Sequence, residues 1–211
     1  PGTLWVVTGD HGEELYERNR YVSHSASIYD GVLRAPLLFV WPGRIPAGAW
    51  RSDLAEAVDI APTVLRLCGV DAPASFHGRD LGPERGDFAE GADAEAAVAD
   101  AAVAELEDRV LSLRTSRYRY VSNPDGFHFP LSDDPAAARY VIAREELYDL
   151  EADPGERINI AGSRPDVAAR FREAADRWRR AHGWEEASRR FRKEAVPEEL
   201  KEELDALGYL N

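Results

Sequence analysis

The stretch that decides the predicted fold is Thr3-Leu4-Trp5-Val6-Val7-Thr8-Gly9-Asp10-His11-Gly12. Its first half is apolar and β-branched, which is typical of a strand, and glycine follows it at once. A near-continuous apolar strand indicates burial on both faces, as in a parallel α/β sheet. A second run of this kind, Pro36-Leu37-Leu38-Phe39-Val40-Trp41, stops at Pro42-Gly43. We therefore expect two buried strands of an α/β sheet.

The residues after these strands predict helices and loops around that sheet. Residues 12–24 are rich in charge and form a predicted polar loop, and Ser25–Val32 is predicted as a short helix. A better-marked helix runs from Ile60 to Leu67: Asp59 is its expected N-cap, and Gly69 supplies a C-terminal stop. The same pattern places Cys68 at a buried helix end.

The second half of the chain has a different composition. Residues 84–108 are dominated by Ala, Asp and Glu, and they predict an acidic linker or insertion. A β-hairpin follows over Val110–Ser122, with Arg117 near its turn, and a strand over Glu146–Leu150 precedes a turn at Asp153–Glu156. Ser163 then opens a helix whose apolar stripe is expected to pack on the small sheet. The members of this stripe are Val167, Phe171, Ala174 and Trp178.

These boundaries predict three regions. Residues 1–83 form part of an α/β domain, 84–108 are a linker or insertion, and 109–211 form a small α+β subdomain with an antiparallel sheet and a packing helix. The chain opens directly into a core strand at Pro1 and contains no methionine, so we expect a segment upstream of it. No leader peptide can be recognised, and localisation stays open.

Composition excludes several classes of protein. The chain has 211 residues, of which 44% are apolar, which is enough for a packed core. Its formal net charge of −13 disfavours nucleic acid as a partner. No run of eighteen apolar residues exists, so no transmembrane segment is expected. The single cysteine, Cys68, allows no disulfide within the chain and does not define the compartment.

The pair Asp10-His11 is the sharpest candidate for chemistry. It follows a predicted buried strand, and ligands of open α/β sheets bind outside the carboxyl ends of their strands. A carboxylate and an imidazole are suitable ligands for a divalent metal. Gly9 and Gly12 flank the pair and permit a tight turn with close backbone approach. The alternative is that Asp10 caps a turn and His11 is an ordinary surface residue.

Sequence context favours the metal site. The motifs Thr8-Gly9-Asp10-His11-Gly12-Glu13, then His24, then Leu33-Arg34-Ala35-Pro36-Leu37-Leu38-Phe39-Val40-Trp41-Pro42-Gly43 resemble the sulfatase family of the alkaline-phosphatase-like superfamily. Four later motifs also resemble it, in the same order: Val58-Asp59-Ile60-Ala61-Pro62-Thr63-Val64-Leu65, Gly78-Arg79-Asp80-Leu81, Leu113-Arg114-Thr115-Ser116-Arg117-Tyr118-Arg119-Tyr120 and Glu146-Leu147-Tyr148-Asp149-Leu150. The resemblance extends from residue 3 to about 182, apart from 84–108 and 123–143, and it is to the C-terminal portion of the family.

The resemblance implies roles for individual residues. Asp10 and His11 would supply part of a divalent-metal site, and His24 would contact the transferred group or the leaving oxygen as a catalytic or substrate-binding residue. His77 lies where the family shapes its substrate mouth, which makes it a weaker substrate-binding candidate. The family's nucleophile lies upstream in a Cys/Ser-x-Pro/Ser-x-Arg motif that this chain lacks, and Cys68 does not match it. A formylglycine made from that Cys or Ser is expected in the missing upstream part.

The implied activity is metal-dependent hydrolysis of sulfate esters, by a chain that needs the upstream half of the same protein. His11 stands where calcium-dependent sulfatases often have Asn, and imidazole favours Mn, Zn or Fe over Ca. Phosphodiester and phosphonate monoester hydrolases and phosphoethanolamine-type transferases share the Asp-His pair, so a small phosphorylated substrate is the alternative to a sulfated one. A non-catalytic binding fragment is the third reading.

Overall fold

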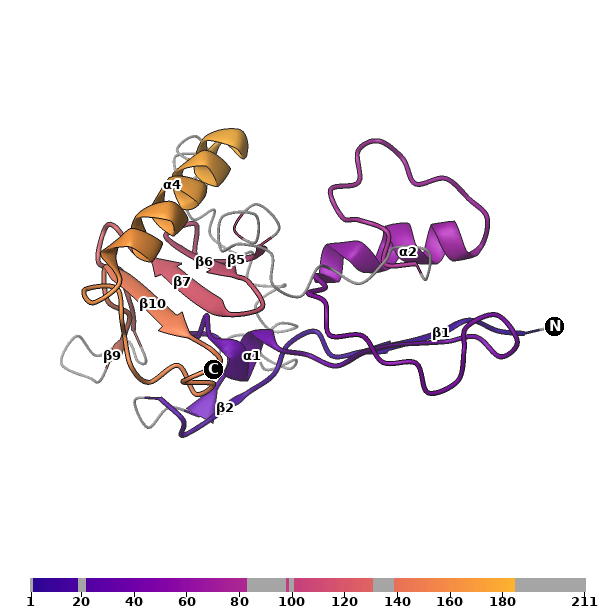
Figure 1. Ribbon diagram of the computed structural model, residues 1–211, viewed down its shortest axis with the longest axis horizontal. Helices are drawn as coiled ribbons and strands as arrows, with labels where there is room; N and C mark the ends of the chain where they lie inside the picture. Colours follow the sequence, from indigo (N-terminus) through magenta and orange to yellow (C-terminus); the bar gives the residue numbers. More distant parts are fainter. Residues whose placement is uncertain (1, 19–21, 83–97, 99–100, 131–138, 185–211) are drawn as a thin grey trace, which may run out of the picture. The chain divides into compact units, whose positions relative to one another are not determined.

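The computed structural model describes residues 2–18, 22–82, 98, 101–130 and 139–184 (Figure 1). The chain divides into two compact units, Pro1–Asp176 and Arg177–Asn211. Among the described residues, no helix combines the length and the apolarity needed to cross a bilayer. Four separate sheets occur in the described part, and the largest has four strands.

The two apolar runs form strands β1 (Trp5–Thr8) and β4 (Leu37–Val40), which pair with each other. The pairing is antiparallel, with Trp5 opposite Val40 and Thr8 opposite Leu37. Both strands were expected and are present, but the expected burial on both faces is wrong for this chain. Trp5 is 60% exposed and Val7 is 52% exposed. The physical reason is that a two-stranded ribbon has no described neighbour here that covers its faces.

The predicted polar loop 12–24 contains a second antiparallel pair. Strands β2 (Glu14–Leu15) and β3 (Val22–Ser23) place Glu14 opposite Ser23. The helix predicted over Ser25–Val32 is shorter than expected: only α1 (Asp30–Leu33) is helical. A turn replaces its first part, because the Ser27 N–H donates to the His24 carbonyl and the Ser27 hydroxyl donates to Glu14. Such local side-chain bonds compete with the helix.

The helix predicted after Asp59 is α2 (Ile60–Leu67), and Gly69 follows it with φ +76°. Asp59 was expected to cap α2, but its side chain makes no capping hydrogen bond to that helix. It ends a short 3₁₀ helix, η1 (Ala57–Asp59), and its buried carboxylate accepts from the backbone N–H groups of Glu56 and Arg79. These bonds tie the loop that follows α2 back to its start. Cys68 ends α2 as predicted, but it is exposed rather than buried.

The four-stranded sheet has the order β10-β7-β6-β5 and is antiparallel throughout (Figure 1). The predicted hairpin is confirmed as β6 (Val110–Arg114) and β7 (Tyr118–Ser122), and the predicted late strand as β10 (Glu145–Asp149). Strand β5 (Ala102–Leu106) lies inside the range 84–108 that was predicted as a linker. These five residues therefore belong to the sheet; residues 83–97 lie outside the described part. A further pair joins β8 (His128–Pro130) to β9 (Arg139–Val141).

Strand β7 is buried on both faces, and the two faces have different neighbours. Tyr118 and Tyr120 meet Phe171 of helix α4 (Pro165–Ala181), with ring centroids 6.3 and 5.6 Å apart. The predicted packing of this helix on the small sheet is thus confirmed within the first unit. On the opposite face, Val121 joins a core cluster with residues of the segment that precedes α1, among them Ile28. The sheet thereby holds the segment that begins at His24.

The second unit is described only as far as residue 184. In this unit, the indole of Trp178 stacks on the imidazole of His182 at a centroid distance of 4.2 Å. Trp184 contacts Trp178 edge-on, with ring centroids 5.7 Å apart. Trp178 was predicted as the last member of the apolar stripe. Its ring neighbours His182 and Trp184 belong to the same short C-terminal stretch, and residues 185–211 lie outside the described part.

Candidate metal centre

The register of the β2–β3 pair places the candidate residues. Glu14 lies opposite Ser23, so one step outward along the same antiparallel ladder Glu13 faces His24. Successive side chains on a strand point to opposite faces. Glu13 is therefore exposed, whereas Glu14 is buried and accepts hydrogen bonds from Ser27 (2.5 Å) and Tyr140 (2.6 Å). One glutamate anchors the ribbon to the core, and its neighbour is left available at the surface.

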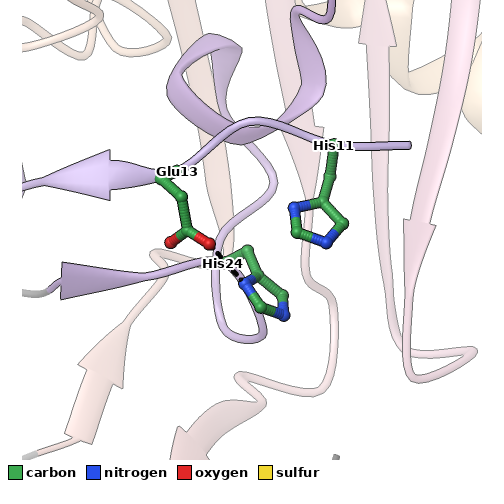
Figure 2. Close-up of side chains that lie close together, drawn as sticks. All are labelled: His11, Glu13 and His24. Atoms are coloured by element: carbon green, nitrogen blue, oxygen red, sulfur yellow. Dashed lines mark hydrogen bonds and ion pairs between the residues drawn. The ribbon is translucent and has the colours of Figure 1, made fainter. Parts of the chain in front are cut away.

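Glu13, His24 and His11 form one compact group (Figure 2). The His24 Nδ1 atom lies 2.8 Å from the Glu13 Oε1 atom, and the rings of His11 and His24 stack with centroids 4.0 Å apart. One potential ligand atom from each of the three residues lies within 4.8 Å of the others. Figure 2 shows that His11 and Glu13 come from the segment after β1, and His24 from the segment after β3.

Asp10 lies at the edge of this group. Its Oδ2 atom is 3.7 Å from the Nε2 atom of His11, and its Oδ1 atom accepts the His11 backbone N–H at 3.0 Å. The Asp10 side chain is 84% exposed. An oxygen and an imidazole nitrogen at this separation fit a single divalent ion with ligand bonds of about 2.0–2.2 Å after a small rotation. The pair is thus compatible with a metal, and its role stays a prediction.

The backbone holds this region in place through Gly12. Its N–H donates to the Val32 carbonyl at 2.7 Å, and a Cβ atom at position 12 would overlap the Gly31 carbonyl oxygen. The predicted close backbone approach is therefore confirmed at Gly12. Gly9 has more room, since the atom nearest to a Cβ there would be the His11 carbonyl oxygen at 3.3 Å. Docking on α1 fixes the start of the loop that presents His11 and Glu13.

His77 lies elsewhere in sequence, in the exposed loop after α2, and is not part of the His11–Glu13–His24 group. The loop is pinned at Gly78, because a Cβ atom there would overlap the Val58 carbonyl. The Leu81 N–H also donates to the Thr63 hydroxyl at 2.9 Å. The loop that carries this histidine is therefore held in place, and its substrate role stays a prediction.

A buried charge cluster lies at the other end of the segment that begins with His24. Arg119 is 1% exposed and pairs with Asp30 and Glu156, and Asp30 also accepts from Arg114 at 2.9 and 3.1 Å. Burial alone would raise the pKa of Asp30, but Arg114 and Arg119 hold it below its usual value. Burial raises the pKa of Glu156 more than Arg119 lowers it. Each residue has a charged partner, which indicates a structural role.

A second buried group lies beside it. The hydroxyls of Tyr29 and Tyr148 both donate to Glu146, at 2.6 and 2.9 Å, and the guanidinium of Arg18 lies 3.7 Å from the centroid of the Tyr29 ring. Burial, followed by the charge of Glu146, raises the pKa of both tyrosines. These hydroxyls therefore stay protonated near neutral pH, and they serve as donors rather than as anions.

Sequence reasoning missed Glu13 as a candidate. The residue was quoted within the Thr8–Glu13 motif, but no role was assigned to it. One signal in the sequence could have found it. Glu13 follows His11 by two residues, which places both side chains on the same side of an extended segment. The antiparallel pairing that brings His24 to it was hidden, because β2 and β3 have only two residues each.

Comparison with known proteins identifies relatives of this chain. The family model for the C-terminal part of N-sulphoglucosamine sulphohydrolase matches residues 22–92. Human arylsulfatase A is 30% identical over 184 residues, which cover 78% of this chain and 35% of that protein. The chain spans about a third of the length of the curated relatives it matches.

Solved structures agree with these relatives. A protein solved in complex with its substrate D-glucosamine-2-N,6-O-disulfate is 26% identical, with a TM-score of 0.60 over 90% of this chain and 36% of that one. The phosphonate monoester hydrolase of Silicibacter pomeroyi has the same fold, with 24% identity and a TM-score of 0.59 over 84% of this chain and 35% of that one. The chain is similar to the sulfatase family in sequence and fold, and the family model that it matches is that of a C-terminal portion.

Proposed function

We propose that the protein to which this chain contributes hydrolyses sulfate esters with the help of a divalent metal ion. The observation that carries the proposal is the approach of Asp10 and His11 at the end of β1, with 3.7 Å between carboxylate oxygen and imidazole nitrogen. This pair occurs in a chain similar to the sulfatase family, whose members generally use a divalent metal and a formylglycine. The substrate class is a small sulfated molecule.

The metal would be held by Asp10 and His11 together with ligands from outside this chain. Bound there, it would supply positive charge to a non-bridging oxygen of the ester group. The Asp10 backbone and side chain orient His11, because the carboxylate accepts the His11 N–H and thereby fixes the turn. The Nδ1 atom of His11 lies 2.9 Å from the Gly12 carbonyl, and a proton donated there leaves the Nε2 lone pair for the metal.

His24 would act on the transferred group. With its Nδ1 atom facing Glu13, its Nε2 atom is turned away from that carboxylate. As an imidazolium it donates one N–H to Glu13 and presents the other to an oxygen of the substrate. That N–H can stabilise charge on the ester group or pass a proton to the leaving oxygen. His77 remains a weaker candidate for a contact to the leaving group.

The nucleophile and the remaining metal ligands would come from an upstream segment of the same protein. No residue of this chain matches the family's nucleophile motif, and Cys68 is an exposed residue at the end of α2. In a sulfatase the nucleophile would be a formylglycine. The exposed apolar faces of β1 and β4 support an upstream partner, because side chains such as Trp5 and Leu38 gain from being covered.

A phosphonate or phosphodiester substrate is the second candidate. It is favoured by His11, since an imidazole ligand suits transition metals better than calcium. It is also favoured by the fold shared with a phosphonate monoester hydrolase. Both reactions need the same features of this chain: a metal pair at the end of β1 and a donor at His24.

The test is an assay of the protein encoded by the reading frame that continues upstream of Pro1. It is incubated with the 4-nitrophenyl esters of sulfate, phosphate and phenylphosphonate. We expect sulfate-ester hydrolysis with the highest kcat/KM, a loss of about 10²-fold or more in kcat for His24→Ala, and no turnover by the 211-residue chain alone. Preference for phenylphosphonate would replace sulfate by the second candidate. Turnover by the 211-residue chain itself, or a reading frame that starts at Pro1, would contradict the proposal.

A further inference from the structure

We propose that His11, Glu13 and His24 form a transition-metal site of their own, which takes Zn²⁺ or Co²⁺ without Asp10. The proposal goes beyond the sulfatase reaction, because it uses a different set of ligands from the Asp10–His11 pair. Its basis is the convergence of two imidazoles and one carboxylate on one region of the surface (Figure 2). Only the shared residue, His11, could serve both sets.

The distances suit one ion. The potential ligand atoms lie within 4.8 Å of one another, and the shortest pair, His24 Nδ1 and Glu13 Oε1, is 2.8 Å apart. Ligands that bind zinc at about 2.0–2.2 Å in tetrahedral geometry are separated by about 3.3 Å. One pair must therefore open by a few tenths of an ångström, and the others must close. Rotations of exposed side chains achieve this without backbone movement, since all three lie between 38% and 46% exposed.

The donor types select the metal. Two imidazole nitrogens with one carboxylate are the ligand set of a common class of zinc hydrolases, which leaves a fourth position open. Calcium and magnesium prefer shells made of oxygen and would gain little from the two nitrogens. Zn²⁺ and Co²⁺ are therefore the ions that this group should distinguish most sharply from Ca²⁺.

The scaffold holds the donors near this arrangement before any ion arrives. The β2–β3 register fixes Glu13 opposite His24, and the buried Glu14 anchors the same ribbon through Ser27 and Tyr140. The Gly12 N–H bond to Val32 fixes the side of the loop that carries His11. Because these contacts lie in the core and in backbone ladders, little ordering remains to be done on binding.

One consequence rests on the proposed function. An ion held by His24 removes that imidazole from contact with the ester group. Excess Zn²⁺ is then expected to inhibit hydrolysis in competition with substrate, while Ca²⁺ at the same concentration is not. The ligand set itself is independent of this consequence, since it is defined by binding to the chain and not by turnover.

The experiment uses the 211-residue chain, with Zn²⁺ titrated by calorimetry and Co²⁺ by its visible absorption. Glu13→Gln and Asp10→Asn are a matched pair, since each replaces one carboxylate next to His11 by an amide. We expect Glu13→Gln and His24→Ala to weaken Co²⁺ and Zn²⁺ binding by about tenfold or more, and Asp10→Asn to change it by less than about threefold. His77→Ala, which alters an exposed histidine outside the group, serves as the control and should bind as the parent does.

Three results would overturn the proposal: no binding of either ion by the parent chain, a loss in Asp10→Asn as large as in Glu13→Gln, or unchanged binding in His24→Ala. Circular dichroism of each variant separates ligand loss from unfolding, and a variant that unfolds is replaced by Glu13→Ala or His24→Asn. The sulfatase reading can fail in the turnover assay while the binding pattern stands. The reverse outcome is equally recognisable.

Discussion

Two groups of charged side chains lie at the two ends of the segment from His24 to Asp30, and they differ in almost every physical respect. At one end, His24 meets Glu13 and His11 at the surface. At the other end, Asp30 meets Arg119 in the interior, where Arg119 is 1% exposed. The side chains of the surface group are between 38% and 46% exposed, and the buried group has a charged partner for each member.

The difference teaches how to separate chemistry from architecture in this chain. Charges removed from water are costly unless each is paired and hydrogen-bonded, so a buried group with complete partners has no capacity left for a ligand. A half-exposed group of imidazoles and carboxylates can exchange its water for a metal at little cost. The buried group should therefore control stability, and the surface group should control binding.

The largest expected effect is the loss of the buried guanidinium. Arg119→Ala leaves Asp30 and Glu156 short of their partner, and breaking a buried pair of this kind costs about 3–5 kcal/mol. The free energy of unfolding, measured by urea denaturation, should fall by that amount. Arg117→Ala is the control, because Arg117 is half exposed and its pair with Asp149 is worth about 0–1 kcal/mol. Equal losses in both variants would remove the distinction between the two groups.

The next effect concerns the contact that links the surface group to α1. Gly12→Ala places a Cβ atom against the Gly31 carbonyl, and such overpacking costs about 1–3 kcal/mol. Because the loop that carries His11 and Glu13 must shift, binding of Co²⁺ should weaken as well. Gly162→Ala is matched to it, since a Cβ atom there has open space around it and the residue does not have a positive φ. That variant should unfold within about 0.5 kcal/mol of the parent.

A smaller effect should appear in acid, through Asp30. Arg114 and Arg119 hold its folded-state pKa below the ordinary value of an aspartate, so its contribution to stability is complete above that ordinary value. The contribution is lost as the pH falls through the folded pKa. Carboxyl resonances of the folded protein, followed by NMR, should show that Asp30 titrates below the ordinary aspartate pKa of about 3.9. A titration at or above that pH would mean that Arg114 and Arg119 do not stabilise the carboxylate.

The smallest expected effect on stability is that of Glu13→Gln. The residue is exposed and its pair with His24 lies in water, so the free energy of unfolding should change by less than about 0.5 kcal/mol. The same variant is expected to bind transition metals about tenfold or more weakly. Glu13→Gln should thus change metal binding and not stability, whereas Arg119→Ala should lower the free energy of unfolding. A stability loss above 2 kcal/mol, on the order of that for a core residue, would assign Glu13 to the architecture instead.

The sequence predicted those parts of the fold whose signals are local. The alternation and turn at Val110–Ser122 gave the hairpin, and the helical stripe around Phe171 gave the helix and the face that packs. Gly69 and Pro42-Gly43 ended their elements where expected. Each of these patterns depends on residues within one turn or one strand of each other.

The sequence could not predict contacts between distant segments. Asp30 and Glu156 are 126 residues apart in the sequence, and the Asp30 N–H donates a hydrogen bond to the Glu156 carboxylate. Glu156 is therefore buried, although it belongs to a polar turn whose residues are expected to lie in solvent. Asp59 is a residue type that often caps helices, but its carboxylate accepts the backbone N–H of Arg79, which lies in a later loop. Glu13 was overlooked for the same reason, because its partner His24 arrives through a pairing too short to recognise.

The candidate site was predicted in part. Asp10 and His11 were found from the strand that precedes them and from the family motif, and their proximity follows from their being adjacent. His24 was taken from the resemblance, and the structure places it against His11 at 4.0 Å between ring centroids. What no pattern supplied was the carboxylate of Glu13 next to His24, which adds a third potential ligand to the two imidazoles.

The most direct test of the central account is the metal content of the protein expressed from the complete upstream reading frame. After dialysis against metal-free buffer, elemental analysis should find about one divalent ion per chain in a Glu13→Gln parent, which lacks the second set of ligands, and almost none when Asp10→Ala is added to it, since one carboxylate of a small ligand set is lost. Arg117→Ala should retain the ion as the parent does. Unchanged metal content when Asp10→Ala is added would contradict the assignment of the end of β1 as a metal centre.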